Sequence, residues 1–235
     1  MTRATMLGRT ALLAAVGAAT SAGAQTSRED PTDVQAWYGA GLALDLPSRW
    51  EAEFRYRVRT DHDGSAYQGS YLGAELGRRV HDRVTVTGGY RLALTDEPPA
   101  HRFSLDAEAS ARVGTLALSL RPALQYRLRR VEGDDEQDGP GRLTFRTRLR
   151  ARGRITDALD AYASAEPVVQ LGDDTFVRGW RNTVGVRLEY ARGRRVDLFY
   201  SLRPDYAKSY NRTFHVLGVD LDFEAAPWKR RGQRR

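Results

Sequence analysis

Four histidines are the residues of this chain best suited to acid–base chemistry: His62, His81, His101 and His215. Histidine titrates near neutral pH and is the commonest general base. His62 lies between Asp61 and Asp63, a triplet that could hold a metal ion or a proton, although solvated polar loops often contain such triplets. The chain has no cysteine, which excludes thiolate metal sites and cysteine nucleophiles. Because no spacing fixes a nucleophile beside a base, the sequence predicts no catalytic residue, no metal site and no cofactor.

A second set of residues could act through charge alone. Arginines and carboxylates recur at every second position of several segments, as in Arg55, Arg57 and Arg59. Charged side chains that face a barrel lumen set ion selectivity, and guanidinium groups favour anions. Such side chains can equally fill the interior as an ion-pair network and leave a narrow or closed passage. The residues expected to line the interior are Arg55, Arg57, Arg59, Arg91, Arg127, Arg146, Arg148, Arg150, Glu51, Glu53, Glu108 and Glu166.

The elements that must position these charges are strands. From Trp50 to Thr60, apolar or small residues alternate with Glu and Arg, a period of two that is typical of a strand with one apolar and one polar face. The same alternation returns at 84–94, 102–113, 143–152 and 213–223. A tilted membrane-spanning strand needs about 9 to 11 residues, whereas globular strands usually have about five or six. The runs therefore have the length of membrane strands.

The connections between the runs alternate in length. Those near 47–48, 79–82, 114, 156–157 and 191–194 are short, whereas those at 60–66, 95–100, 131–141, 172–179 and 204–212 are longer and more polar. Short periplasmic turns and longer outer loops are typical of a bacterial outer-membrane barrel. The pattern gives eleven strands, including 36–46. Since bacterial single-chain barrels normally have an even number, one assignment is expected to fail, which leaves ten or twelve.

The N-terminus has the features of a cleaved signal peptide over residues 1–24. Arg3 and Arg9 precede an apolar run at 11–19 and a small-x-small end at 22–24. The run is too short to anchor the chain in a bilayer. The predicted organisation is a signal peptide at 1–24, a closed antiparallel all-β transmembrane barrel of 10 to 12 strands at 25–223, and a basic tail at 224–235.

The formal net charge of +7 does not indicate nucleic acid as a partner. Two of the cations lie in the first 24 residues and five in the last seven, and the segment between them is balanced. Nucleic-acid binders concentrate Lys and Arg on one face. A secreted chain with this balance is therefore not expected to bind DNA or RNA.

The last strand, 213–223, resembles an outer-membrane assembly signal, with apolar residues at alternate positions and a closing Phe223. With the segments 162–166, 180–182, 188–190 and 215–217, it makes the mature chain similar to a family of small proteobacterial barrels, the 2490 family of domains of unknown function. The resemblance implies a barrel in the outer membrane of a Gram-negative cell. The barrel assembly machinery, membrane lipid and lipopolysaccharide are the partners expected there. It implies no activity and no site residues, and the oligomeric state is not indicated.

The expected function is non-enzymatic: a narrow, porin-like channel for small solutes with a preference for anions. A barrel enzyme that hydrolyses lipid or peptide at the outer surface, and a structural or surface-binding barrel, remain alternatives. A soluble lipocalin-like barrel also alternates, but it turns its apolar face inward. The two locations are distinguished by Phe54, Tyr56, Leu92 and Leu105, which lie outside in a membrane barrel and inside in a soluble one.

Overall fold

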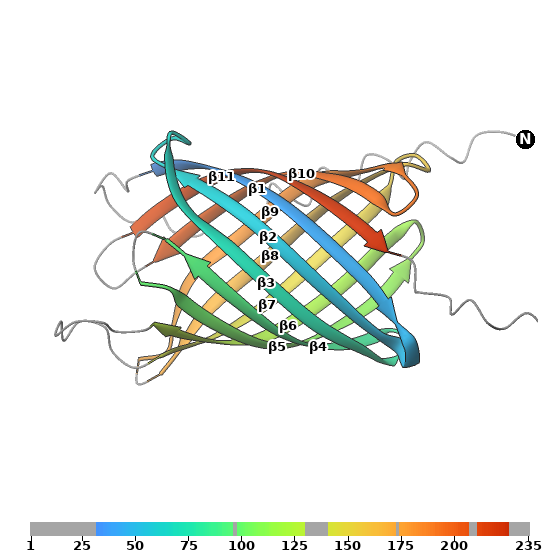
Figure 1. Ribbon diagram of the computed structural model, residues 1–235, viewed down its shortest axis with the longest axis horizontal. Helices are drawn as coiled ribbons and strands as arrows, with labels where there is room; N and C mark the ends of the chain where they lie inside the picture. The colour runs from blue at the N-terminus through green and yellow to red at the C-terminus, as the bar shows by residue number, and fades with distance from the viewer. Residues whose placement is uncertain (1–31, 96–97, 130–140, 173, 207–210, 226–235) are drawn as a thin grey trace, which may run out of the picture. The chain divides into compact units, whose positions relative to one another are not determined.

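The chain folds into a closed β-barrel whose strands run obliquely around the wall (Figure 1). The computed structural model describes residues 32–95, 98–129, 141–172, 174–206 and 211–225. The strands are β1 (Thr32–Leu46), β2 (Trp50–Asp61), β3 (Ala66–His81), β4 (Val84–Leu94), β5 (Ala100–Val113), β6 (Leu116–Arg129), β7 (Arg142–Arg154), β8 (Leu159–Leu171), β9 (Phe176–Ala191), β10 (Arg194–Tyr206) and β11 (Asn211–Ala225), and the 3-10 turn η2 (Pro47–Arg49) follows β1. Over these ranges no helix has the length and apolar character needed to cross a membrane.

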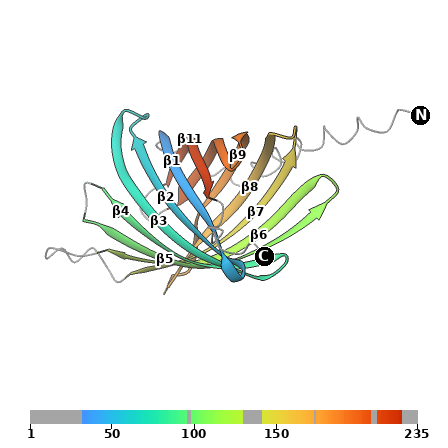
Figure 2. The same ribbon diagram turned by 45° about the vertical axis from the view of Figure 1, so that its right-hand side comes forward.

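Each strand pairs antiparallel with the next along the chain, and the barrel closes through a parallel pair between β1 and β11. Their register runs from Thr32 opposite Thr213 to Leu44 opposite Ala225. Both ribbon views place β1 between β2 and β11 (Figures 1 and 2). The expectation that one of the eleven strand assignments fails is therefore wrong, as is a wholly antiparallel barrel. An even number is required only when the first and last strands pair antiparallel, and a parallel pair closes an odd number.

Glycine makes room for ion pairs across this closing pair. Gly39 of β1 lies opposite Asp220 of β11, and a Cβ on Gly39 would overlap the Asp220 carboxylate. The guanidinium of Arg55 on β2 reaches past β1 to Asp220, with Nη1 3.1 Å from Oδ2. It also reaches Asp222, with Nη2 3.2 Å from Oδ1, and Arg57 pairs with Asp220 as well. The second and eleventh strands are thus joined by charge across the first.

The expected division of the two faces is confirmed. Phe54 and Leu105 lie on the outer face with 51% and 60% of their surface exposed, and Tyr56 is also exposed. Leu92 follows the same alternation, between the exposed residues Tyr90 and Leu94. The buried polar and charged residues of the described chain are Gln35, Thr87, Asp106, Glu166, Asp197, Ser201 and Asp220. The molecule is therefore apolar outside and polar inside.

Most connections at one end have two or three residues and those at the other end have four or more, although 155–158 has four residues, as 172–175 does. The barrel therefore has two different ends. We call the end with the short connections, such as 82–83, the turn end, and the opposite end, with connections such as 62–65, the loop end. β1 begins at the loop end and β11 finishes at the turn end. The predicted signal peptide at 1–24 and the tail beyond 225 lie outside the described residues.

Candidate functional site in the barrel interior

The barrel interior contains three cavities in series. The loop-end cavity, of about 550 Å³, is lined by residues such as Tyr67, Pro98 and Arg178. The central cavity measures about 510 Å³. The turn-end cavity, of about 460 Å³, is lined by residues such as Asp82 and Glu224. Neighbouring cavities share lining residues, so together they follow the barrel from one end to the other.

All twelve residues expected from the sequence to line the interior border these cavities. The loop-end cavity is bordered by Arg59, Arg91, Arg127 and Arg146. The central cavity is bordered by Arg55, Arg57, Arg148, Arg150 and Glu166. The turn-end cavity is bordered by Glu51, and it shares Glu53 and Glu108 with the central cavity. These residues come from six strands. Strands far apart in the sequence therefore contribute to one charged interior.

The charges are divided along the barrel. Among described residues, the loop-end cavity is lined by nine arginines and two aspartates. The turn-end cavity is lined by eight carboxylates and three arginines. The boundary that the loop-end and central cavities share contains Arg59, Arg91, Arg102, Arg146, Arg181 and Arg203, with Tyr71 and Gln125. The boundary between the central and turn-end cavities contains Glu53, Glu75, Asp106, Glu108 and Arg121. The interior is thus electropositive at the loop end and electronegative at the turn end.

Ion pairs occupy the central cavity. Arg121 donates from Nε to Asp106 Oδ1 at 2.7 Å and from Nη2 to Glu75 Oε2 at 3.1 Å. The Nη2 of Arg187 lies 2.7 Å from Asp197 Oδ2, and the Tyr162 hydroxyl donates to the other oxygen of Asp197 at 2.6 Å. Such buried pairs hold long side chains in fixed positions because each carboxylate accepts several charge-assisted hydrogen bonds. They take up part of the interior at its middle.

At the loop-end boundary, a single carboxylate serves two arginines. Glu166 accepts from Arg146 Nε at 2.7 Å, and the Nη1 of Arg181 lies 3.5 Å away. Arg146 also donates from Nη1 to Gln125 Oε1 at 3.0 Å. The other four arginines of this boundary make no hydrogen bond and no ion pair with a described residue: Arg59, Arg91, Arg102 and Arg203.

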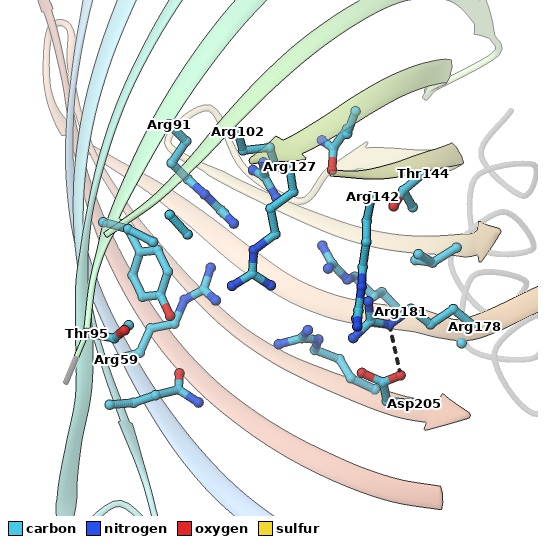
Figure 3. Close-up of a pocket in the computed structure, with 18 of the residues that line it drawn as sticks. Arg59, Arg91, Thr95, Arg102, Arg127, Arg142, Thr144, Arg178, Arg181 and Asp205 are labelled. Carbon is cyan, nitrogen blue, oxygen red and sulfur yellow. Dashed lines mark hydrogen bonds and ion pairs between the residues drawn. The ribbon is translucent and has the colours of Figure 1, made fainter. Parts of the chain in front are cut away.

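Aromatic rings, and not carboxylates, lie beside three of these four arginines, Arg59, Arg91 and Arg203. The Arg59 Cζ lies 3.9 Å from the ring centroid of Trp37 and 4.0 Å from that of Tyr71. Arg203 lies 5.0 Å from the Trp37 ring, and Arg91 lies 5.2 Å from the Tyr71 ring. A guanidinium stacked on a ring keeps its N–H edge free for other acceptors. Figure 3 shows Arg59, Arg91 and Arg102 pointing into the same space.

Arg102, Arg181 and Arg203 also line the interior, although they were not among the residues predicted to do so. Their positions follow from strand parity: Arg181 shares the inward face of β9 with Arg187, and Arg203 shares that of β10 with Asp197. Arg102 in turn shares the inward face of β5 with Asp106 and Glu108. Strand parity is therefore the signal that predicts all three arginines.

The four histidines are not brought together. The Nδ1 of His101 lies 2.8 Å from the Tyr90 hydroxyl, and the Nδ1 of His215 lies 2.7 Å from the Tyr200 hydroxyl. His81 accepts from the backbone N–H of Arg83 at 3.3 Å. Within the described ranges no group of three or more His, Asp or Glu is arranged to hold a metal ion.

His62 lies in the exposed connection between β2 and β3, and its Nδ1 is 2.9 Å from Asp61 Oδ1. The hydrogen bond to Asp61, and then the charge of that carboxylate, raise the pKa of His62 above its ordinary value. The contact is therefore favourable at pH values below the usual histidine pKa of about 6.5 and is lost as the pH rises through the raised pKa.

We expect Asp61→Asn to lower the pKa of His62, as measured by NMR titration of its ring protons. Asp63→Asn is the control and should leave that pKa in place; a pKa unmoved by Asp61→Asn would contradict the contact.

Residues 34–213 match the model of a family described as "Protein of unknown function (DUF2490)". No curated protein matches the chain. The matched region begins within β1 and ends near the start of β11, so it covers β2 to β10 in full.

Proposed function

The chain belongs to the DUF2490 family, and we propose that this member is a non-enzymatic outer-membrane β-barrel with a narrow passage for small solutes. The family's description assigns no activity, so the proposal depends on the physical character of the barrel. Its outer face and its interior each support one part of the proposal.

The observation that carries the membrane location is the inverted distribution of apolar side chains. Large apolar residues such as Phe54, Leu105 and Leu217 are about half exposed or more, whereas carboxylates such as Asp106 and Glu166 are buried. Exposing so much apolar surface to water is unfavourable, at roughly 25 cal/mol per Å². A lipid bilayer removes this cost because its hydrocarbon chains accept the apolar face.

The backbone also suits a bilayer. A membrane contains no water to satisfy open strand edges, so a spanning sheet must be closed, and this barrel is closed. The strands are 11 to 16 residues long, enough for a tilted strand to cross the hydrocarbon core. With short turns toward the periplasm, the turn end faces the periplasm and the loop end faces outward.

The interior supports a passage with a preference for anions at its outer half. The boundary of six arginines favours anions entering from the loop end, while the four carboxylates of the inner boundary oppose their exit. The central ion pairs take up part of the lumen. The proposed passage therefore conducts weakly, and its two ends differ in the ions that they favour.

Planar bilayers containing the purified full chain test the passage. We expect small single-channel steps and a reversal potential that favours anions in a salt gradient. Replacing Glu75 and Glu108 with glutamine should increase the preference for anions, because it weakens the ring of carboxylates at the inner boundary. The absence of steps over a range of salts would overturn the passage and favour a structural barrel filled by ion pairs, which the contacts of Arg121 and Arg187 support. Cell fractionation and faster gel migration without heating test the barrel in the outer membrane independently.

A further inference from the structure

We propose that the loop-end cavity is a binding site for a compact oxyanion that carries two or more negative charges, held by Arg59, Arg91, Arg102 and Arg203. This goes beyond a passage for small solutes. It concerns equilibrium binding in one cavity, and it holds whether or not any ion crosses the barrel. Failure of one proposal is therefore distinguishable from failure of the other.

The charges that line this cavity are not balanced. The described lining of this cavity has nine arginines and two aspartates, and one of those aspartates, Asp205, already accepts from Arg178 at 3.3 Å. Like charges gathered in a partly buried space repel one another more strongly than in bulk water. An anion that enters this space lowers the repulsion among several guanidinium groups at once. Its gain therefore increases with its own charge.

The four arginines have a large hydrogen-bonding capacity. A guanidinium has five N–H donors in a planar fork that matches the oxygens of phosphate and carboxylate. Over the described residues, none of the four donates to a protein acceptor. Elsewhere in the interior, Arg121 is engaged by Asp106 and Glu75, whereas Arg150 of the central cavity stacks on Tyr162 and leaves its Nε unpaired within the described structure. Four arginines with unused donors nevertheless gather at the loop-end boundary, on four different strands.

Aromatic rings hold arginine side chains of this cavity in position before a ligand binds. Arg59 is held between Trp37 and Tyr71, at 3.9 and 4.0 Å from the ring centroids. Trp37 is itself fixed, because it is buried and its Nε1 donates to Gln35 Oε1 at 3.2 Å. Side chains that are ordered before binding lose less conformational entropy when a ligand arrives. Stacking also occupies the faces of the guanidinium and leaves its edge for oxygen atoms.

The size of the loop-end cavity and the access to it suit a small anion. A volume of about 550 Å³ lies within the usual range for small-ligand sites of roughly 300–1,000 Å³. A compact oxyanion of the phosphate or polycarboxylate type fits with part of its hydration water. The carboxylates of the turn-end cavity repel such a ligand, so it enters and leaves from the loop end.

The test is equilibrium binding to the full chain folded in neutral detergent, measured by calorimetry at constant ionic strength. The probes are pyrophosphate, inorganic phosphate, citrate and chloride. We expect pyrophosphate or citrate to bind at least tenfold more tightly than chloride. Stronger binding of pyrophosphate assigns the site to phosphate-type ligands, and stronger binding of citrate assigns it to polycarboxylates. Binding of all four anions with the affinity of chloride would overturn the site, and this comparison needs no variant.

Variants locate the binding. Arg102→Gln alone and Arg59→Gln with Arg203→Gln should each weaken binding of the preferred anion by roughly tenfold or more, because each removes charge-assisted hydrogen bonds. The matched control is Arg79→Gln with Arg83→Gln, which removes two cations from the turn-end cavity and should leave the affinity within about twofold. Heat-dependent gel migration verifies that each variant is folded. Equal losses in the control and the loop-end variants would show nonspecific attraction and overturn the proposal.

Discussion

The Asp220→Asn variant is expected to lose about 2–3 kcal/mol of the free energy of unfolding. The side chain of Asp220 is 8% exposed and pairs with both Arg55 and Arg57 across β1. Arg55 keeps Glu53 and Asp222 as partners, but in the described structure Arg57 has no other carboxylate. Removing one partner of a dry, buried pair costs roughly 3–5 kcal/mol, and water in the interior reduces this cost.

Urea unfolding in detergent or lipid vesicles, followed by tryptophan fluorescence, measures the loss. The matched control is Asp82→Asn, because the Asp82 side chain is 82% exposed and its pair with Arg49 at 3.3 Å lies on the surface. Exposed pairs contribute about 0–1 kcal/mol. Equal effects of the two substitutions would mean that the parallel closure of β1 on β11 does not depend on these charges.

A double-mutant cycle tests the closure from the other side. Gly39→Val places side-chain atoms where the Asp220 carboxylate lies, so it should destabilise the barrel strongly on its own. Combined with Asp220→Ala, it should cost less than the sum of the two single changes, because residues in contact couple energetically. Simple additivity would argue against the observed register of Gly39 opposite Asp220.

The strands and their faces could be predicted because the information is local. In β2, the alternation from Trp50 to Thr60 fixes both the extended backbone and the side that each residue faces. The way the barrel closes could not be predicted in the same manner. It depends on which strand lies beside β1, and neither Gly39 nor Asp220 reveals its partner within its own segment. An even strand number was therefore the natural expectation, and the parallel pair overturns it.

The interior charges could be predicted as a set, but their arrangement along the barrel could not. Arg59, Arg102 and Arg203 meet at one level although they lie on β2, β5 and β10. The level of each residue depends on strand tilt and stagger, which are properties of the closed barrel. For the same reason, the separation of arginines from carboxylates between the two ends became visible only in three dimensions.

The outer face provides the other large expected effect. If this face lies in lipid, Leu105→Arg should cost about 2–4 kcal/mol of the free energy of unfolding in bilayers, because Leu105 lies near the middle of β5 and thus near the bilayer midplane. The control is Val113→Arg on the same strand. Val113 is 61% exposed against 60% for Leu105, but it ends the strand at the turn end, where an arginine costs about 0–1 kcal/mol.

The comparison separates lipid from water because exposure is matched and only depth differs. On a barrel surrounded by water, both arginines would be solvated, and both substitutions should change stability by less than about 0.5 kcal/mol. In a bilayer, the central arginine must bend toward the interface or draw water into the hydrocarbon, whereas the one at the strand end reaches the headgroups directly. Urea titrations of the two variants in vesicles give the difference. Equal, small effects would place the apolar face in water and remove the basis for a membrane barrel.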